Sequence, residues 1–370
     1  MMIRKTATIL ALLMLGSAMP LSAQQGIEEI PFEAVKFGKM PKDLYMGEAS
    51  GVAVNSKGHV FVVSRGNTSG PAYAAAADEL YEFDSQGNFV REIGHKLYAW
   101  GFAHGVSVDR HDNIWIADKG TDMVVEFNPE GEVILVLGRK AEAADESAKP
   151  WDRSISPPLP AQAGRFRQVT GVAFDSKDNA YISDGYVNSR VGVVNKDGDW
   201  MASYGTFGKE PGQFNTVHGI ANDAQDRIYV ADRSNRRIQV LDTAGKVVRI
   251  ITMDVPFPKD TKMVMGDQPG PNGVPAGSLL APGAPWTVCV TPPNAKGVQY
   301  LYASDAYPGR IYKMTLEGKM LGYVGMGGRT IGKFGWIHGL ACPDENTVYA
   351  AELLNWRVQK ITMKPKASQQ

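Results

Sequence analysis

The chain has 370 residues, with equal numbers of basic and acidic residues and a formal net charge of zero. No basic block occurs, which argues against nucleic acid or an anionic membrane surface as the partner. With only two cysteines, Cys289 and Cys342, the fold does not depend on a disulfide framework. We interpret both as small buried side chains; the alternative, a disulfide between them, is left open by the sequence.

The N-terminal segment, residues 1–23, is typical of a secretory signal peptide. Two basic residues precede the apolar run 9–15, and Ala23 offers a small residue for cleavage. The apolar run is too short for a membrane anchor. We therefore expect an exported protein, periplasmic or extracellular and without a membrane anchor, whose residues 24–370 form a single domain.

A strand pattern then repeats six times. Each unit opens on a short apolar run, passes through a polar turn such as 109–113, and continues in a second β-rich run such as 114–118. Two further strands follow in most units. The opening runs are 50–54, 104–108, 170–174, 218–222, 286–290 and 338–342. Six antiparallel four-strand units predict an all-β fold, a six-bladed β-propeller.

The two ends of the repeat predict how the ring closes. The last unit has only three strands, ending around 358–363, whereas residues 32–38 form a lone strand pattern before the first unit. We expect this N-terminal strand to complete the last blade, which removes a free sheet edge.

The long insertions all fall at one end of the strands. They cover residues 67–78, 139–168 and 252–285. In a four-stranded meander, the loop between strands two and three lies on the same face as the connections between blades. That elaborated face is the expected location of a binding site.

Three His-Gly dipeptides open every second unit. They begin at His104, His218 and His338, separated by 114 and 120 residues. In a ring of six units, these side chains would point at the axis from three sides. Three imidazoles with an open fourth position are the ligand set of a catalytic transition metal. The alternative is that the histidines only line a channel, since His-Gly also suits the backbone here.

Acidic residues recur at the end of the second strand, and we interpret them as acceptors that stabilise the following turns. They are Asp118, Asp184, Asp232 and Asp305. The first unit has Arg65 at this position instead. A guanidinium on the elaborated face suits a substrate carboxylate, because it binds one bidentately; the alternative is a solvated surface arginine.

Two more residues on this face are candidates for catalysis. Tyr186 follows Asp184 by two positions, and it would serve as a general base if nearby cations lowered its pKa. Arg233 directly follows Asp232. The alternatives are a tyrosine that packs on a neighbouring blade and an arginine common to this kind of repeat.

The residues match a known family. The segment 231–240 resembles NHL repeats, and the chain from about 50 to 239, and again around His338, resembles the peptidyl-α-hydroxyglycine α-amidating lyases (peptidylamidoglycolate lyases). The matching segments, in order, are 64–66, 103–109, 183–186, 188–190, 216–218 and 231–233.

This resemblance implies a six-bladed propeller that cleaves a C-terminal α-hydroxyglycine to a peptide amide and glyoxylate. By this resemblance, the zinc ligands would be His104, His218 and His338. The catalytic residues would be Arg65 and Tyr186, and Arg233 would be a second active-site arginine. The family has a calcium-binding aspartate directly after the third histidine, where this chain has Gly339, so a structural calcium is doubtful. A family cysteine is replaced by Val187.

We therefore expect a secreted, monomeric zinc-dependent lyase acting on an N-acyl or peptidyl hemiaminal that carries a free carboxylate. One alternative is a non-catalytic NHL propeller that binds a protein or peptide. Another is a propeller hydrolase such as a lactonase. The residues that open the six units are histidine, serine, threonine and tryptophan, which disfavours a calcium-dependent lactonase.

Overall fold

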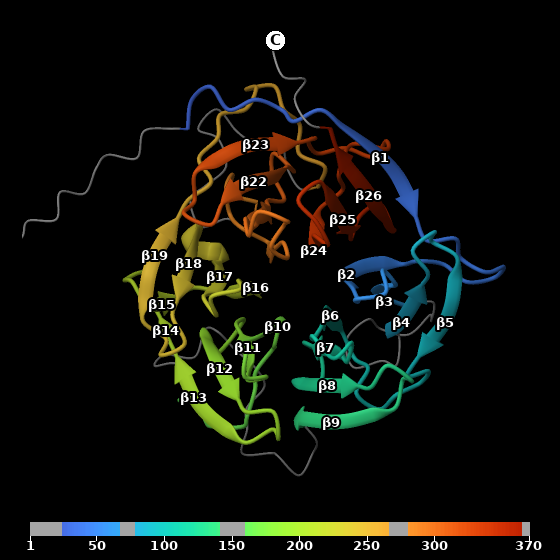
Figure 1. The fold of residues 1–370 in the computed structure, drawn as a ribbon, viewed down its shortest axis with the longest axis vertical. Helices are drawn as coiled ribbons and strands as arrows, with labels where there is room; N and C mark the ends of the chain where they lie inside the picture. The colour runs from blue at the N-terminus through green and yellow to red at the C-terminus, as the bar shows by residue number, and fades with distance from the viewer. Residues whose placement is uncertain (1–23, 67–77, 141–159, 266–279, 365–370) are drawn as a thin grey trace, which may run out of the picture.

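The computed structural model describes residues 24–66, 78–140, 160–265 and 280–364. Six four-stranded antiparallel sheets stand around a central axis like the blades of a propeller (Figure 1). The predicted all-β, six-bladed architecture is thereby confirmed. The expected signal peptide lies outside the described residues, as do parts of all three insertions.

Each blade is a meander whose first strand lies nearest the axis. Blade 1 contains β2 (Glu48–Val54), β3 (Val60–Arg65), β4 (Asp78–Phe83) and β5 (Phe89–Ile93). Blade 2 contains β6 (Ala103–Val108), β7 (Ile114–Asp118), β8 (Met123–Phe127) and β9 (Val133–Gly138). Blade 3 contains β10 (Gly171–Phe174), β11 (Ala180–Asp184), β12 (Arg190–Val194) and β13 (Trp200–Tyr204).

The remaining blades follow the same plan. Blade 4 contains β16 (Val217–Asn222), β17 (Ile228–Asp232), β18 (Arg237–Leu241) and β19 (Val247–Ile251). Blade 5 contains β20 (Thr287–Val290), β21 (Tyr300–Ser304), β22 (Ile311–Thr315) and β23 (Met320–Val324). Blade 6 contains β24 (Ile337–Ala341), β25 (Thr347–Glu352), β26 (Arg357–Met363) and β1 (Phe32–Phe37).

Other regular structure is short. The strands β14 (Thr206–Phe207) and β15 (Gln213–Phe214) pair in parallel between blades 3 and 4. Helical structure in the described ranges is confined to the 3₁₀ turn η2 (Arg233–Asn235). Nothing helical in those ranges has the length and apolar character needed to cross a membrane.

The ring closes as predicted. Strand β1 pairs antiparallel with β26, with Phe32 opposite Met363 and Phe37 opposite Val358 (Figure 1). The N-terminal strand is thus the outer edge of the last blade. Because both chain ends are held in one sheet, unfolding that blade requires breaking contacts at both termini.

The core consists of six apolar layers, one between each pair of neighbouring blades. Between blades 1 and 2, for example, Val63 and Leu80 pack with Ile116 and Phe127, all four essentially inaccessible to solvent. Burying each such side chain stabilises the fold by about 1.5–3 kcal/mol. Outer strands are more exposed than the inner ones; in β13 exposed and half-buried residues alternate, as in an antiparallel sheet with one wet face.

The glycine of each His-Gly pair has a packing role. A Cβ at Gly105 would meet the Thr170 carbonyl oxygen at 2.6 Å, and one at Gly339 would meet the Gly51 Cα at 2.8 Å. Neighbouring inner strands therefore approach so closely that only glycine fits. They enclose a channel of about 230 Å³ along the axis.

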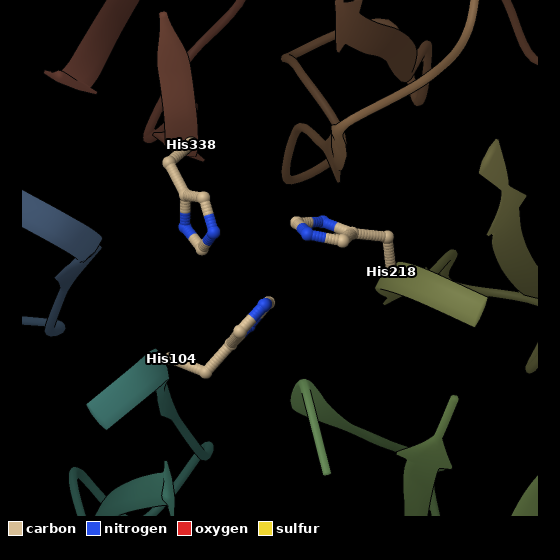
Figure 2. A group of neighbouring side chains, drawn as sticks. All are labelled: His104, His218 and His338. Atoms are coloured by element: carbon tan, nitrogen blue, oxygen red, sulfur yellow. The ribbon is translucent and has the colours of Figure 1, made fainter. Parts of the chain in front are cut away.

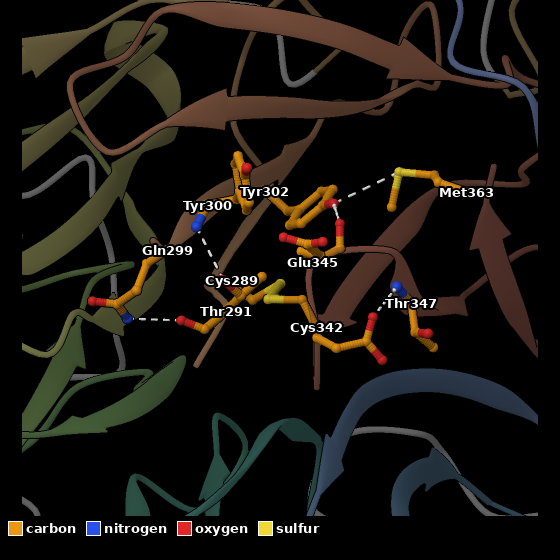
Figure 3. The surroundings of a disulfide bond; sticks show 10 residues. Cys289, Thr291, Gln299, Tyr300, Tyr302, Cys342, Glu345, Thr347 and Met363 are labelled. Atoms are coloured by element: carbon orange, nitrogen blue, oxygen red, sulfur yellow. Dashed lines mark hydrogen bonds between the residues drawn. A yellow bond between two sulfur atoms is a disulfide. The ribbon is translucent and has the colours of Figure 1, made fainter. Parts of the chain in front are cut away.

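The two cysteines form a disulfide, which was the alternative to two separate buried side chains. Cys289 lies on β20 and Cys342 directly follows β24, so the bond joins the inner strands of blades 5 and 6 (Figure 3). Nearby, the Tyr302 hydroxyl donates a hydrogen bond of 2.7 Å to the Glu345 carbonyl oxygen, a second contact between these two blades.

The insertions lie where the sequence predicts them. They follow β3, β9 and β19, each at the end where the inner strands begin. The opposite face is made of tight turns such as 109–113, in which Asp109 accepts hydrogen bonds from the backbone of His111 and Asn113. The strand ends from which the three insertions leave thus lie at the predicted face.

Candidate functional site

Three histidines meet on the axis at the elaborated face. His104, His218 and His338 lie at or near the start of the inner strands β6, β16 and β24, and each is at most 5% exposed. Their ring centroids are 4.4–4.9 Å apart, and the rings point at one another from three sides (Figure 2). We call these three residues the histidine cluster.

The next blade orients each ring. The Nδ1 of His104 is 2.9 Å from the Thr170 carbonyl oxygen, and the Nδ1 of His218 is 2.6 Å from that of Trp286. Because a carbonyl oxygen only accepts, Nδ1 carries the proton and Nε2 keeps its lone pair. The Nε2 atoms are thereby left for a ligand on the axis.

The surroundings of the histidine cluster favour its neutral form. Burial lowers the pKa of all three imidazoles well below the usual value of 6.5. The neighbouring positive charges act in the same direction, above all those of Arg65 and Arg233. Neutral imidazoles are the form that binds metal ions.

The donor set fits a divalent metal. One ligand atom from each ring lies within 4.8 Å of the other two. The Nε2 of His104 is buried and has no hydrogen-bond partner in the described part of the chain, which is costly unless a ligand occupies the centre. The three histidines together are able to hold a metal ion.

Tyr186 lies directly beside the histidine cluster. Its hydroxyl oxygen is 3.0 Å from the Nε2 of His218 and accepts a hydrogen bond of 3.3 Å from Arg233. Burial alone would raise the pKa of the phenol, but the positive charges of Arg233 and Lys119 outweigh it and lower the pKa below 10. This is the electrostatic setting that a tyrosine base requires.

Arg233 is a buried cation. It is 1% exposed, its guanidinium carbon lies 4.2 Å from the centroid of the Trp286 ring, and the only hydrogen-bond acceptor of its side chain among the described residues is Tyr186. Its Nε has no partner, and no described carboxylate pairs with it. A buried charge without a counter-ion is destabilising, so the site is built to receive an anion.

The side-chain contacts of Arg65 differ from those of Arg233. Its Nη1 lies 3.2 Å from a Glu48 carboxylate oxygen, and its Nε donates to the Ala103 carbonyl oxygen at 3.1 Å. Its guanidinium carbon lies 3.8 Å from the centroid of the Phe102 ring. The structure thus gives Arg65 a carboxylate partner, whereas Arg233 has none in the described ranges.

Sequence reasoning missed several residues of the site. Lys119 stands one position after Asp118, as Arg233 stands one position after Asp232, so its place in the repeat was the signal. The Nζ of Lys119 lies 4.2 Å from the centroid of the Tyr186 ring. The other missed side chains are aromatic: Phe102, Trp286 and Trp336, each directly before or near the start of an inner strand.

The recurring acids stabilise turns, as predicted. Asp118 accepts hydrogen bonds from the backbone of Gly101, Phe102 and Thr121. Asp305 likewise accepts from the backbone of Gly283 and Gly309. These contacts fix the loops that carry the functional side chains.

The glycine after the third histidine leaves no room for a side chain. A Cβ at Gly339 would lie 2.8 Å from the Gly51 Cα and 3.1 Å from the Val52 nitrogen. A calcium-binding aspartate would therefore force the inner strands of blades 6 and 1 apart. The packing gives a physical reason for the glycine here.

Comparison with known proteins agrees with this architecture. Residues 214–241, which span β16 to β18, match the NHL repeat family. The chain carries an NHL repeat. The match covers three of the four strands of blade 4, and the other blades follow the same strand plan.

Curated relatives that match this chain at low sequence identity carry the names of amidating enzymes. A peptidylglycine alpha-amidating monooxygenase of Rattus norvegicus is 26% identical over 180 residues, which are 44% of this chain and 17% of that protein. A Caenorhabditis elegans protein named "Probable peptidyl-alpha-hydroxyglycine alpha-amidating lyase" is 23% identical over 171 residues, 42% of this chain and 44% of that protein. The matched part thus spans less than half the length of either relative.

Solved structures share the fold. A streptogramin B lyase has a TM-score of 0.52 at 13% identity, covering 90% of this chain and 98% of that one. A gluconolactonase of Xanthomonas campestris has a TM-score of 0.53 at 12% identity, covering 92% of this chain and 96% of that one. Likeness at such identities establishes the propeller and says nothing about the reaction.

Proposed function

We propose that this NHL propeller is an exported zinc-dependent lyase, which cleaves an N-acyl or peptidyl α-hydroxyglycine to an amide and glyoxylate. The observation that carries the proposal is the histidine cluster, with the Tyr186 hydroxyl and the Arg233 guanidinium directly beside it. Similarity to proteins named as amidating lyases supports it.

His104, His218 and His338 would hold the zinc ion. Three neutral imidazole nitrogens suit zinc and leave a fourth position for substrate. When bound, zinc supplies a Lewis acid that lowers the pKa of a hydroxyl group.

The side chains around the zinc site would bind the substrate and accept the proton of its hydroxyl group. Arg233 binds the substrate carboxylate, because it is a buried cation beside Tyr186 and the histidine cluster, and no described carboxylate neutralises it. Tyr186, as phenolate, accepts the hydroxyl proton, and Arg65 adds to the positive potential that favours this phenolate. As the carbonyl of glyoxylate forms, the C–N bonding pair goes to nitrogen, which takes a proton and leaves as the amide. No water is consumed.

The proposal also includes the location of the protein and its binding partner. Residues 1–23 would direct export to the periplasm or the cell exterior, and the Cys289–Cys342 disulfide suits such an oxidising compartment. The partner would be a small molecule or peptide with a free carboxylate, bound by a monomer.

The test is glyoxylate release from α-hydroxyhippurate by purified protein loaded with zinc. We expect release that is lost on chelation and in His218→Ala, and retained in His95→Ala, because His95 is an exposed histidine outside the cluster. Zinc binding without glyoxylate release would contradict the proposed reaction. If zinc also failed to bind, the metal centre would be refuted, and a peptide-binding propeller would be favoured instead.

A further inference from the structure

Each histidine of the cluster lies where the pairing between the first two strands of its blade shifts register. The register of β6 against β7 shifts between Ala103 and Gly105, so His104 stands opposite no residue of β7. The pairing shifts in the same way at His218 in blade 4 and at His338 in blade 6. A residue left out of the ladder is not held by it, and the strand bends there. Contacts from other blades must therefore fix the positions of the three imidazoles.

Ser50, which lies on β2 in blade 1, contacts two of these histidine positions. Its carbonyl oxygen is 2.6 Å from the Nδ1 of His338. Its hydroxyl donates a hydrogen bond of 2.9 Å to the carbonyl oxygen of Ala103, the residue directly before His104. Ser50 is 1% exposed, so solvent does not compete for these contacts. One residue thus links the ring of His338 to the backbone that carries His104.

Thr170 repeats this arrangement in blade 3. Its carbonyl oxygen is 2.9 Å from the Nδ1 of His104. Its buried hydroxyl lies 3.1 Å from the carbonyl oxygen of Val217, the residue directly before His218, and 2.7 Å from the Ser183 hydroxyl. Because a hydroxyl both donates and accepts, Ser183 is able to donate to Thr170 and leave the Thr170 proton for Val217. Thr170 thereby links the ring of His104 to the backbone that carries His218.

Blade 5 has the orienting carbonyl but not the hydroxyl. Trp286 stands at the position of Thr170, and its backbone N–H donates to the Ser304 carbonyl oxygen at 2.8 Å. The backbone N–H of Thr170 donates to the Ser183 carbonyl oxygen at the same distance, so the two serines are equivalent. The buried Ser304 hydroxyl has no hydrogen-bond partner in the described part of the chain. The contacts of the Thr170 hydroxyl are therefore a feature of its own blade and are not required by the repeat.

We propose that the hydroxyls of Ser50 and Thr170 are positioning groups for the metal centre, which hold the backbone at His104 and His218 so that the imidazoles keep the spacing a metal ion requires. The inference rests on the metal centre of the proposed function and adds two residues that do not touch the ion. The orienting carbonyls act on the imidazole rings, whereas these hydroxyls act on the backbone that carries them. Ligands of a metal ion need such outer support, because their geometry sets the affinity.

Zinc affinity of the purified full chain, measured by competition with a chromophoric chelator, tests the proposal. Thr170→Val and Ser50→Ala remove the hydroxyls and keep the carbonyl groups that orient the imidazoles. We expect the affinity to fall by about 10–100-fold in Thr170→Val. The loss should be smaller in Ser50→Ala, because Arg65 also donates to the Ala103 carbonyl oxygen, at 3.1 Å. Thr170→Ser keeps the hydroxyl and should retain the affinity of the unaltered protein.

A spectrum and a control variant separate positioning from a general loss of stability. Cobalt bound in place of zinc has a visible absorption spectrum that reports the coordination geometry, so its bands should shift in Thr170→Val and return in Thr170→Ser. Ser304→Ala is the matched control, because it removes a buried hydroxyl that makes no hydrogen bond to a described residue. It should leave both the zinc affinity and the cobalt spectrum unchanged.

Two results would overturn the positioning role alone. One is a Thr170→Val variant with the zinc affinity and cobalt spectrum of the unaltered protein; the other is an equal loss of affinity in Ser304→Ala. If the unaltered protein binds no zinc, the positioning role and the metal centre are both refuted. None of these measurements depends on turnover, so a zinc-binding protein that releases no glyoxylate would refute the lyase reaction and leave the positioning role standing.

Discussion

The ring nitrogen Nδ1 of His338 donates a hydrogen bond of 2.6 Å to the carbonyl oxygen of Ser50, across the junction between the last blade and the first. Thr170 and Trp286 supply the equivalent carbonyl oxygens to the other two histidines. Serine, threonine and tryptophan open the odd blades at the position where the even blades have histidine. Alternate blades thus contribute the imidazole and the carbonyl that orients it, so the site is complete only when the ring is closed.

Removing one histidine of the cluster should abolish metal binding. We expect His338→Ala to hold less than about a tenth of the zinc held by the unaltered protein, because two imidazoles and water bind zinc far more weakly than three imidazoles. Elemental analysis after dialysis measures the zinc. His95→Ala should retain about one zinc per chain; equal zinc in both variants would contradict the cluster as the site.

Removing the unpaired buried cation should impair catalysis more than folding. We expect Arg233→Met to lower kcat/KM by about 100-fold, as loss of a charged hydrogen-bonding partner does, with little change in the free energy of unfolding. Arg237→Met is the contrasting variant, because Arg237 is 2.7 Å from the buried Asp232 carboxylate. Breaking that pair should cost about 3–5 kcal/mol of stability. A large stability loss in Arg233→Met would argue for a structural arginine.

Activity should rise with pH as Tyr186 loses its proton. Burial opposes ionisation, but the charges of Arg233 and Lys119 lower the pKa of the phenol below its ordinary value of 10. The ascending limb of the plot of kcat/KM against pH should therefore reach half its maximum below pH 10. Tyr186→Phe should lower the rate by about 10²–10⁴-fold and lack this limb. A phenylalanine variant with the same profile would exclude Tyr186 as the base.

Stability should fall as pH rises towards 8, and the buried acid Asp78 is one cause of this fall. Burial and the neighbouring Asp118 carboxylate raise the pKa of Asp78 from 3.8 to about 8. The unfolded chain releases this proton near pH 4, while the folded chain keeps it. The folded state therefore binds more protons in between, and its advantage is lost as pH rises through 8.

Asp78→Asn should make this dependence shallower, while other buried acids with raised pKa values, such as Asp122 and Glu126, still contribute to it. Asparagine still accepts the hydrogen bond of the Ala103 backbone N–H, which is 2.9 Å from the carboxylate, and it does not ionise. Urea denaturation between pH 5 and 9 measures the slope. Asp84→Asn, at an exposed turn acid whose pKa is lowered by hydrogen bonds from Asn88, should keep the slope of the unaltered protein. An unchanged slope in Asp78→Asn would refute this account.

Loss of the disulfide should destabilise the ring. Cys289 and Cys342 are 53 residues apart, and closing a loop of this length in the unfolded chain is worth about 4 kcal/mol. Replacing both with alanine should lower the denaturation midpoint accordingly. The unaltered protein in reductant should behave like the double variant; a midpoint that stays the same in both would contradict a stabilising role.

The sequence by itself determined the architecture and the centre of the site. Strand alternation, turn residues and the sixfold repeat act locally, so they specify the blades, and the lone strand at 32–38 indicates the closure with β26. The spacing of His104, His218 and His338 places them in alternate units of a closed ring. Their convergence on the axis follows from that symmetry alone.

Only the tertiary structure decided which charges meet. Arg65 pairs with Glu48 and Arg233 with no described carboxylate, although the sequence predicted Arg65 as the partner of the substrate carboxylate. Lys119 joins Tyr186, and Cys289 joins Cys342, across blade boundaries. A repeat specifies the face from which a side chain projects, but contacts between blades depend on how closely the inner strands approach. That distance is set by packing around the whole ring, which no local pattern records.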